Sequence, residues 1–207
     1  FLKIKLHRTN YARMFALRRN SARSRTTLIK CDNIYDSILV WDDLGANYPF
    51  SRLSSDFETD PFDSLSIYLL SNNDVLVSRD GGQSFNNISG SLPDVPVHTI
   101  KLDTVTRDLY LGSHAGVFYR GANDTDWTPF SSGLSKNARV RDIDIYYHPT
   151  DHKLSKLKAA TYGRGLWESE LADGAGIPER VSTYITSDHK PFSYENEYEI
   201  RVEFRQH

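Results

Sequence analysis

The chain has 207 residues, a formal net charge of −2 and a hydrophobic fraction of 39%, which are ordinary values for a folded globular protein and exclude wholesale disorder. No apolar run approaches the roughly 18 residues that a membrane-spanning helix requires. The single cysteine, Cys31, excludes an internal disulfide framework and a cysteine-built zinc site.

Residues 1–31 form a strongly basic N-terminal arm. They contain nine Lys or Arg residues and no Asp or Glu, so all 27 acidic residues lie in the rest of the chain. Apolar residues recur at roughly helical spacing between the arginines, which predicts an amphipathic helix over residues 10–23. Such an arm could bind a phosphate-bearing polymer, dock onto an acidic surface, or neutralise the acidic body of its own protein. Nucleic-acid binding rests on composition alone and is not favoured.

Residues 32–65 are less regular. A period of two predicts short strands over residues 28–31 and 37–41, with a turn at residues 45–49. The acidic stretch at residues 52–63 is interrupted by Pro61 and is expected to be a loop. Its carboxylates are interpreted first as surface charge, then as a calcium site, and last as catalytic groups: Asp56, Glu58, Asp60 and Asp63.

From residue 66 onward the sequence repeats itself. Residues 75–85 align with residues 117–127 at an offset of 42, and residues 97–102 align with residues 140–145 at an offset of 43. A period of this length, built from short strands and turns, is the size of one four-stranded β-propeller blade. Three units are expected, at about residues 66–95, 96–138 and 139–171, the first of them without a recognisable opening strand.

One turn in the repeat carries a known motif. Residues 78–85 fit the pattern S/T-x-D-x-G-x-S/T-W/F through Ser78, Asp80, Gly82, Ser84 and Phe85. The chain therefore resembles the Asp-box (BNR, sialidase-like) repeat proteins, which are related to sortilin-type and xyloglucanase-type propellers, over about residues 66–171. The resemblance implies an all-β fold of four-stranded blades forming a partial propeller. It also implies that these five residues have a structural role in a hairpin turn.

The expected organisation has four parts. Residues 1–31 are the basic helical arm, and residues 32–65 are a strand and acidic-loop region that contributes part of a blade. Residues 66–171 are the propeller blades. Residues 172–207 are a linker followed by a β-strand extension, because residues 194–205 alternate between apolar and charged side chains.

No catalytic constellation stands out. The Arg-Ile-Pro start of the true sialidases is absent, and no pair of carboxylates has a supporting motif for glycoside hydrolysis. We expect no metal site and no cofactor, and calcium has no support beyond the acidic stretch. In a four-stranded blade the turn between the second and third strands shares one end with the link to the next blade. This places four candidate ligand-binding residues on the ligand face of the family: His114, Arg139, Tyr162 and Arg164.

The favoured function is a non-catalytic recognition and assembly module for a carbohydrate or protein ligand. The alternative is a fragment of a carbohydrate-active glycoside hydrolase. Three blades do not close a ring, so further blades of a longer parent chain or protein partners are expected. Two sequons, at Asn87 and Asn123, weakly favour an extracellular or cell-surface location. Phe85, Trp127 and Trp167 are expected to be buried between blades.

Overall fold

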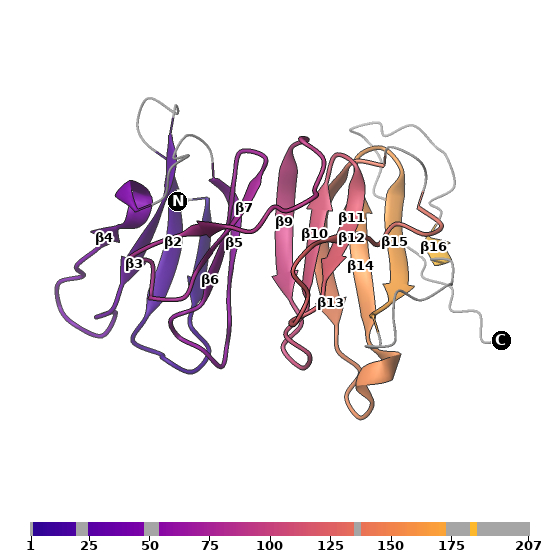
Figure 1. Cartoon of the computed structure of the whole chain (residues 1–207). Helices are drawn as coiled ribbons and strands as arrows, with labels where there is room; N and C mark the ends of the chain where they lie inside the picture. The colour runs from indigo at the N-terminus through magenta and orange to yellow at the C-terminus, as the bar shows by residue number, and fades with distance from the viewer. Residues whose placement is uncertain (1, 20–24, 48–53, 135–137, 173–182, 186–207) are drawn as a thin grey trace, which may run out of the picture.

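The computed structural model describes residues 2–19, 25–47, 54–134, 138–172 and 183–185. These residues form four antiparallel sheets of four strands each, together with two short 3-10 helices, η1 (Leu44–Ala46) and η2 (His152–Leu154). The sheets follow one another along the chain and stand side by side in a row (Figure 1). The chain is therefore all-β, and its sheets are successive blades of a β-propeller, as the repeat predicts.

Each blade is a simple meander in which every strand pairs with the next one along the chain. The first blade contains β1 (Lys3–Leu6), β2 (Met14–Arg19), β3 (Thr26–Cys31) and β4 (Asp42–Asp43). The second contains β5 (Ser54–Thr59), β6 (Ile67–Ser71), β7 (Asp74–Ser78) and β8 (Asn86–Asn87). The third contains β9 (Val97–Leu102), β10 (Leu109–Ser113), β11 (Gly116–Arg120) and β12 (Thr128–Pro129). The fourth contains β13 (Val140–Tyr146), β14 (Lys156–Thr161), β15 (Gly165–Glu170) and β16 (Thr183–Ile185).

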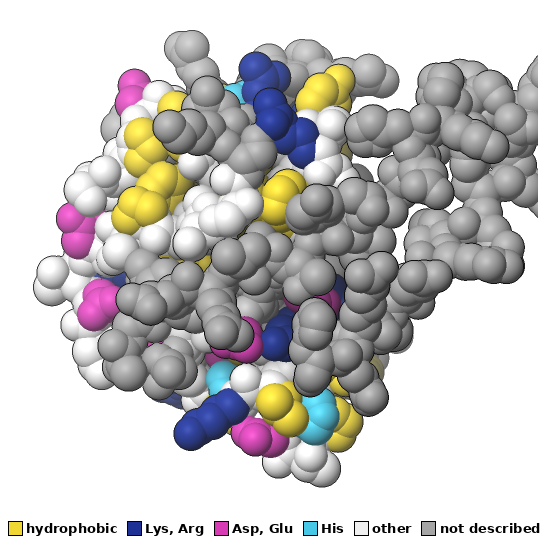
Figure 2. Space-filling model, turned by 90° about the vertical axis from the view of Figure 1, so that its right-hand side faces the viewer, with side chains coloured by type: hydrophobic (Ala, Val, Ile, Leu, Met, Phe, Trp, Pro, Cys, Tyr) yellow, Lys and Arg dark blue, Asp and Glu magenta, His cyan; other side chains and the backbone are white. Residues whose placement is uncertain are grey.

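The first and fourth blades end the row, and each leaves one face without a neighbouring blade among the described residues. Figure 2 looks onto the side of the molecule that the fourth blade forms, where charged side chains of both signs lie among hydrophobic ones. On this blade Lys156 lies 3.5 Å from Glu170, and Lys158 lies 3.7 Å from Glu168, each pair lying directly across from one another on β14 and β15. The last blade of the row thus ends in a partly charged face.

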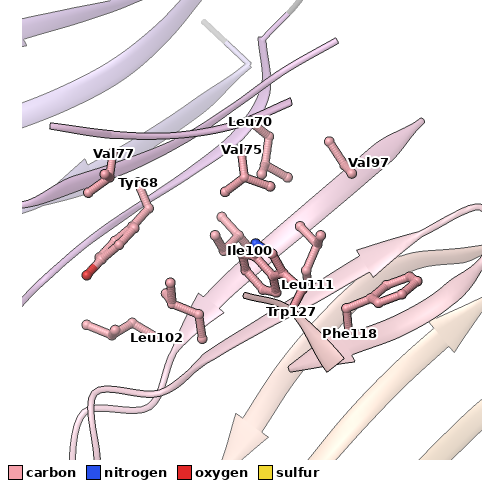
Figure 3. Packing of buried hydrophobic residues seen from close by; sticks show 11 residues of the cluster. Tyr68, Leu70, Val75, Val77, Val97, Ile100, Leu102, Leu111, Phe118 and Trp127 are labelled. Carbon is pink, nitrogen blue, oxygen red and sulfur yellow. The ribbon is translucent and has the colours of Figure 1, made fainter. Parts of the chain in front are cut away.

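Each pair of successive blades shares a hydrophobic cluster. Between the second and third blades, Trp127, Ile100 and Leu111 pack against side chains that include Leu70 and Val75 (Figure 3). Trp127 is buried here, and its Nε1 donates a hydrogen bond of 2.7 Å to the carbonyl of Ile88. The stack is therefore held mainly by burial of apolar surface between sheet faces.

The other two clusters test the predicted aromatic anchors. Phe85 is buried in the cluster between the first and second blades, so it and Trp127 lie between blades as predicted. Trp167 packs against the cluster between the third and fourth blades but is only half-buried. It comes from the strand β15 rather than from the turn after it, so it does not occupy the position that Phe85 and Trp127 share.

The predicted N-terminal helix is wrong. Residues 14–19 form the strand β2, which pairs with β1 and β3 to build the first blade. Phe15, Ala16 and Leu17 are all fully buried, so side chains on both faces of β2 are shielded from solvent. A strand buried on both faces has a continuous apolar run, and such a run has no period of two to distinguish it from a short helix.

The opening strand of the second blade is present, which corrects a second expectation. Residues 54–59, placed in an acidic loop, form β5 and pair with β6. The described residues therefore contain four blades rather than three. The strand predicted over residues 37–41 is also absent, and the short β4 begins at Asp42 instead. The predicted linker at residues 173–178 and the predicted long strand at residues 194–205 lie outside the described residues.

Among the residues that the structure describes, no helix has the length and apolar character needed to cross a membrane.

Candidate functional site

The connections of the blades gather at two opposite ends. At one end, the backbone N–H of His114, in the turn between β10 and β11, donates to the carbonyl of Pro96, just before β9, at 3.0 Å. The equivalent bond in the fourth blade runs from the N–H of Tyr162 to the carbonyl of Arg139 at 2.8 Å. His114 and Tyr162 therefore occupy matching positions in successive blades. We call this end the linker end, because the connections between blades arrive there.

Three side chains stack at the linker end. The rings of His98, on β9, and His114 lie with their centroids 4.6 Å apart at an angle of 53°. Arg141, on β13, places Nη1 3.1 Å from Nε2 and 3.4 Å from Nδ1 of His98. The guanidinium thus lies against the imidazole of the preceding blade, and the stack joins the third blade to the fourth.

The charge around this stack is positive. Burial lowers the pKa of His98 to about 4, with further contributions from the charge of Arg141 and from His114. The pKa of His114 is also lowered, first by burial and then by the charges of Arg139 and Arg141. Both rings are neutral at pH 7 as a result. We call His98, His114, Arg139 and Arg141 the linker-end cluster.

Neither arginine of the cluster pairs with a carboxylate of the described residues. Arg139 and Arg141 are exposed, and within the described part of the chain no ion pair includes either of them. The carboxylate next in sequence, Asp142, instead accepts a hydrogen bond of 3.2 Å from Thr99 Oγ1 and one of 3.0 Å from the N–H of Ile143. Two positive charges therefore face solvent beside two neutral imidazoles.

The four predicted ligand residues are only partly brought together. His114 and Arg139 belong to the linker-end cluster, and Tyr162 lies on the neighbouring turn with 69% of its surface exposed. Arg164 lies in the same turn as Tyr162, and its carbonyl accepts a hydrogen bond of 3.0 Å from Trp167 Nε1.

Sequence reasoning missed His98 and Arg141. Both are the second residue of an inner strand, and the offset of 43 that aligns β9 with β13 also aligns these two positions. Equivalent residues of adjacent inner strands lie side by side in a propeller, so the repeat alignment contained the signal. The equivalent residue of the second blade is Ser55, whose Oγ donates to the carbonyl of Val97 at 3.0 Å.

A second polar feature follows the inner strands along the centre of the row. Lys3 pairs with Asp56, and Lys5 lies 2.6 Å from Glu58, so β1 is tied to β5. In the same way Lys101 lies 3.0 Å from Asp144, which ties β9 to β13. We call these contacts the inner-strand ladder. A cavity of about 450 Å³ lies beside it and is lined by residues of all four inner strands, including Lys5, Glu58, Lys101 and Asp144.

The acidic stretch is therefore mostly structural. Asp56 and Glu58 belong to the ladder, and Asp60 lies 3.5 Å from Arg107. Asp63 accepts a hydrogen bond of 2.6 Å from Ser66 Oγ and another from the N–H of Leu65. In the described ranges, no group of three or more His, Cys, Asp or Glu side chains is arranged to hold a metal ion.

The turn at residues 78–85 lies at the opposite end, where the N–H of Gly81 donates to the carbonyl of Leu65. Asp80 accepts hydrogen bonds from the hydroxyl of Ser78 at 2.7 Å and from the N–H of Ser84 at 3.0 Å, while Ser84 Oγ donates to its other oxygen. These bonds, with that from the Ser84 hydroxyl the strongest, hold the pKa of Asp80 well below its usual range. Gly82 has φ of 92°, and a Cβ there would lie 2.5 Å from a methyl of Leu44.

Comparisons with known proteins identify the fold of the chain but assign it to no family. No family model matches the sequence, and no curated protein matches it. Among solved structures, an ancestral GH74 enzyme is similar with a TM-score of 0.71 and 18% identity, over 90% of this chain and 28% of that one. The GH74 xyloglucanase from Xanthomonas campestris is similar with a TM-score of 0.63 and 13% identity, over 89% of this chain and 30% of that one.

A third solved structure is more distant. YCF48 bound to a D1 peptide has a TM-score of 0.49 and 10% identity, over 76% of this chain and 47% of that one. At these identities the likeness to the two GH74 enzymes shows a shared fold, and the chain spans less than a third of the length of either.

Proposed function

We propose that the chain is a non-catalytic part of an extracellular or cell-surface β-propeller that recognises a carbohydrate or protein ligand at the linker end. The observation that carries the proposal is the linker-end cluster. It places two exposed arginines and two neutral histidines at the junction of two blades, with the exposed ring of Tyr162 on the adjacent turn. Exposed arginine and tyrosine are side chains that recur in recognition surfaces.

A glycoside hydrolase fragment is the second candidate, and the fold likeness to the GH74 enzymes is what favours it. Such chemistry needs a carboxylic acid with a raised pKa opposite a second carboxylate. The carboxylates that line the central cavity, Glu58 and Asp144, are each paired with a lysine. The pKa of Asp144 is lowered: burial acts to raise it, but the hydrogen bond and charge of Lys101 outweigh that effect. This arrangement favours the recognition module over the hydrolase.

We also infer that residues 78–85 are an Asp-box that stabilises the second blade. The hydrogen bonds around Asp80 fix the turn, the positive φ of Gly82 suits glycine, and Phe85 packs into the cluster shared with the first blade. The motif lies at the end of the blades opposite the linker-end cluster. Its role in this proposal is structural and contributes nothing to ligand binding.

The remainder of the proposed propeller comes from further blades of a longer parent chain. Ile4 on β1 lies opposite Ala16 on β2 and is 52% exposed. Its equivalents in the next blades, Phe57 and Ile100, are buried against the blade before them. A preceding blade would cover Ile4 in the same way and would remove an exposed apolar patch.

The test is a binding survey with the chain and matched variants. We expect an array of oligosaccharides and peptides to give ligands whose binding is lost in Arg139→Ala and in Tyr162→Ala but kept in Asp80→Ala. Release of reducing ends from xyloglucan or from aryl glycosides by the chain would favour the hydrolase instead. Binding that is lost in Asp80→Ala and unchanged in the other two variants would contradict the proposed site.

A further inference from the structure

The linker-end cluster combines two arginine charges with two imidazole rings. Arg139 and Arg141 carry charge that no carboxylate in the described residues neutralises. The rings of His98 and His114 lie against each other, and Arg141 lies against His98. Like charges and dipoles gathered in this way raise the free energy of the unliganded site, and an anion lowers it.

The depressed histidine pKa values are consistent with this geometry. After burial, the effects that lower the pKa of His98 and His114 come from Arg139, Arg141 and the neighbouring histidine, and no carboxylate is among them. A bound anion would oppose these effects and raise both pKa values. The two histidines therefore serve as built-in reporters of charge at the site.

The planar guanidinium groups indicate which anion fits. Two N–H donors of a guanidinium match the two oxygens of a carboxylate, and an adjacent neutral imidazole supplies a further donor. Arg141 is exposed on a strand, and the contact of its Nη1 with the ring of His98 fixes the orientation of the guanidinium group. Part of the ordering cost of a long side chain is thereby met before the ligand arrives.

We infer that the linker-end cluster binds a carboxylate group of the ligand. This inference rests on the proposed function and narrows it from any carbohydrate or protein to an acidic one. Arg141 makes the main contact and His98 holds it in place. Arg139 adds a second positive charge, and the neutral ring of His114 lies against His98 on the neighbouring turn.

The experiment follows the histidine Cε1–H signals by NMR while one of two probes is added to the chain. The probes are a triglutamate peptide and glucuronate, which present a carboxylate on a peptide and on a sugar respectively. We expect saturable shifts at His98 and His114 and a rise in the pKa of His98 with at least one probe. Arg141→Gln should weaken that binding by about tenfold or more, as the loss of a charge-assisted pair predicts. Arg141→Lys keeps the positive charge but loses the paired N–H donors of the guanidinium, and it should weaken the binding less than Arg141→Gln does.

The control is Arg8→Gln, which removes one exposed arginine at the opposite end of the inner strands. It should bind both probes as the unchanged chain does, and all variants should melt at closely similar temperatures because Arg8 and Arg141 are both exposed. Absence of saturable shifts with both probes, or equal binding by Arg141→Gln and the unchanged chain, would overturn the inference. If neutral oligosaccharides then still bind in a manner that depends on Tyr162, the proposed function stands and only the carboxylate is wrong.

Discussion

Lys101 and Asp144 occupy the same position on the inner strands of successive blades, and their side chains meet at 3.0 Å. Lys101 lies opposite Tyr110 on the neighbouring strand, just as Asp144 lies opposite Lys158. Lys5 and Glu58 hold the equivalent positions in the first two blades, so the charge alternates in sign from blade to blade. The inner-strand ladder therefore adds charge pairing between successive inner strands to the apolar packing between blades.

Burial predicts that the contacts of the ladder differ in strength. Asp56 is 3% exposed, pairs with Lys3 and accepts hydrogen bonds from the N–H groups of Phe57 and Ile100. Asp56→Ala should therefore lower the free energy of unfolding by about 3 kcal/mol, since it leaves a buried amide without an acceptor. Asp144 is largely exposed, so Asp144→Ala should cost less than about 1 kcal/mol.

Urea denaturation of the two variants measures the difference. Asp56→Asn keeps an oxygen acceptor for the N–H of Ile100 and should fall between the unchanged chain and Asp56→Ala. The Asp144 effect should shrink further in high salt, because exposed pairs are screened. Equal losses in Asp56→Ala and Asp144→Ala would show that the ladder acts only through surface charge.

Trp127 is the anchor between the second and third blades. Its ring is 5% exposed within the cluster that Leu70 and Ile100 share, and Nε1 donates to the carbonyl of Ile88. Trp127→Ala should lower the free energy of unfolding by about 3–5 kcal/mol, the usual cost of emptying a site that held a core aromatic. Trp127→Phe keeps most of the packing and should cost distinctly less. Thermal unfolding of both variants measures the difference, and equal midpoints for Trp127→Ala and Trp127→Phe would contradict a packing role for the ring.

Asp80 makes stability depend on pH. Because its hydrogen bonds lower its pKa in the folded state, the unfolded chain binds the proton more readily than the folded chain does. The stabilisation is therefore fully present above the unfolded pKa of about 3.9 and is lost as the pH falls below it. Asp80→Ala should lower the thermal midpoint at pH 7, and the difference from the unchanged chain should narrow in acid. Ser84→Ala should show a smaller effect of the same sign.

The blade period and one complete turn motif were readable in the sequence. Strands such as β9 and β13 recur at a fixed offset with their apolar residues aligned, so burial between sheets left a clear pattern. In the first blade the strand predicted over residues 28–31 lies within β3, but β2 was not readable because Phe15, Ala16 and Leu17 are all buried and show no alternation. β5 was missed because its Asp56 and Glu58 resemble loop residues, and only the facing Lys3 and Lys5 explain them.

The candidate site was predicted in part for a similar reason. Turn positions such as His114 and Tyr162 follow from blade topology alone. The contact between Arg141 and His98 depends on how one inner strand packs beside the next, which requires the register between blades. Local sequence carries no direct record of that register. The basic arm shows the same limit, because Arg13, Arg18 and Lys3 pair with carboxylates 19, 25 and 53 residues further along the chain.

The free face of the first blade gives the last prediction. Leu2, Ile4 and Leu6 alternate along the inner edge of the row and are 53%, 52% and 57% exposed. Ile100 and Ile143, the equivalents of Ile4 in later blades, are at most 1% exposed because a preceding blade covers them. An uncovered apolar sheet face promotes association, so the chain by itself should form oligomers as its concentration rises.

Replacing Ile4 and Leu6 together by glutamine should reduce this association while leaving the thermal midpoint nearly unchanged, since little buried surface is lost. Light scattering coupled to size-exclusion chromatography measures the first effect, and calorimetry the second. Ile100→Gln is the matched control at a covered position. This variant should have a much lower thermal midpoint and should associate at least as strongly as the unchanged chain. If the double variant associates as strongly as the unchanged chain, the surface through which the copies associate lies elsewhere. The exposed face of the fourth blade would be the next one to test.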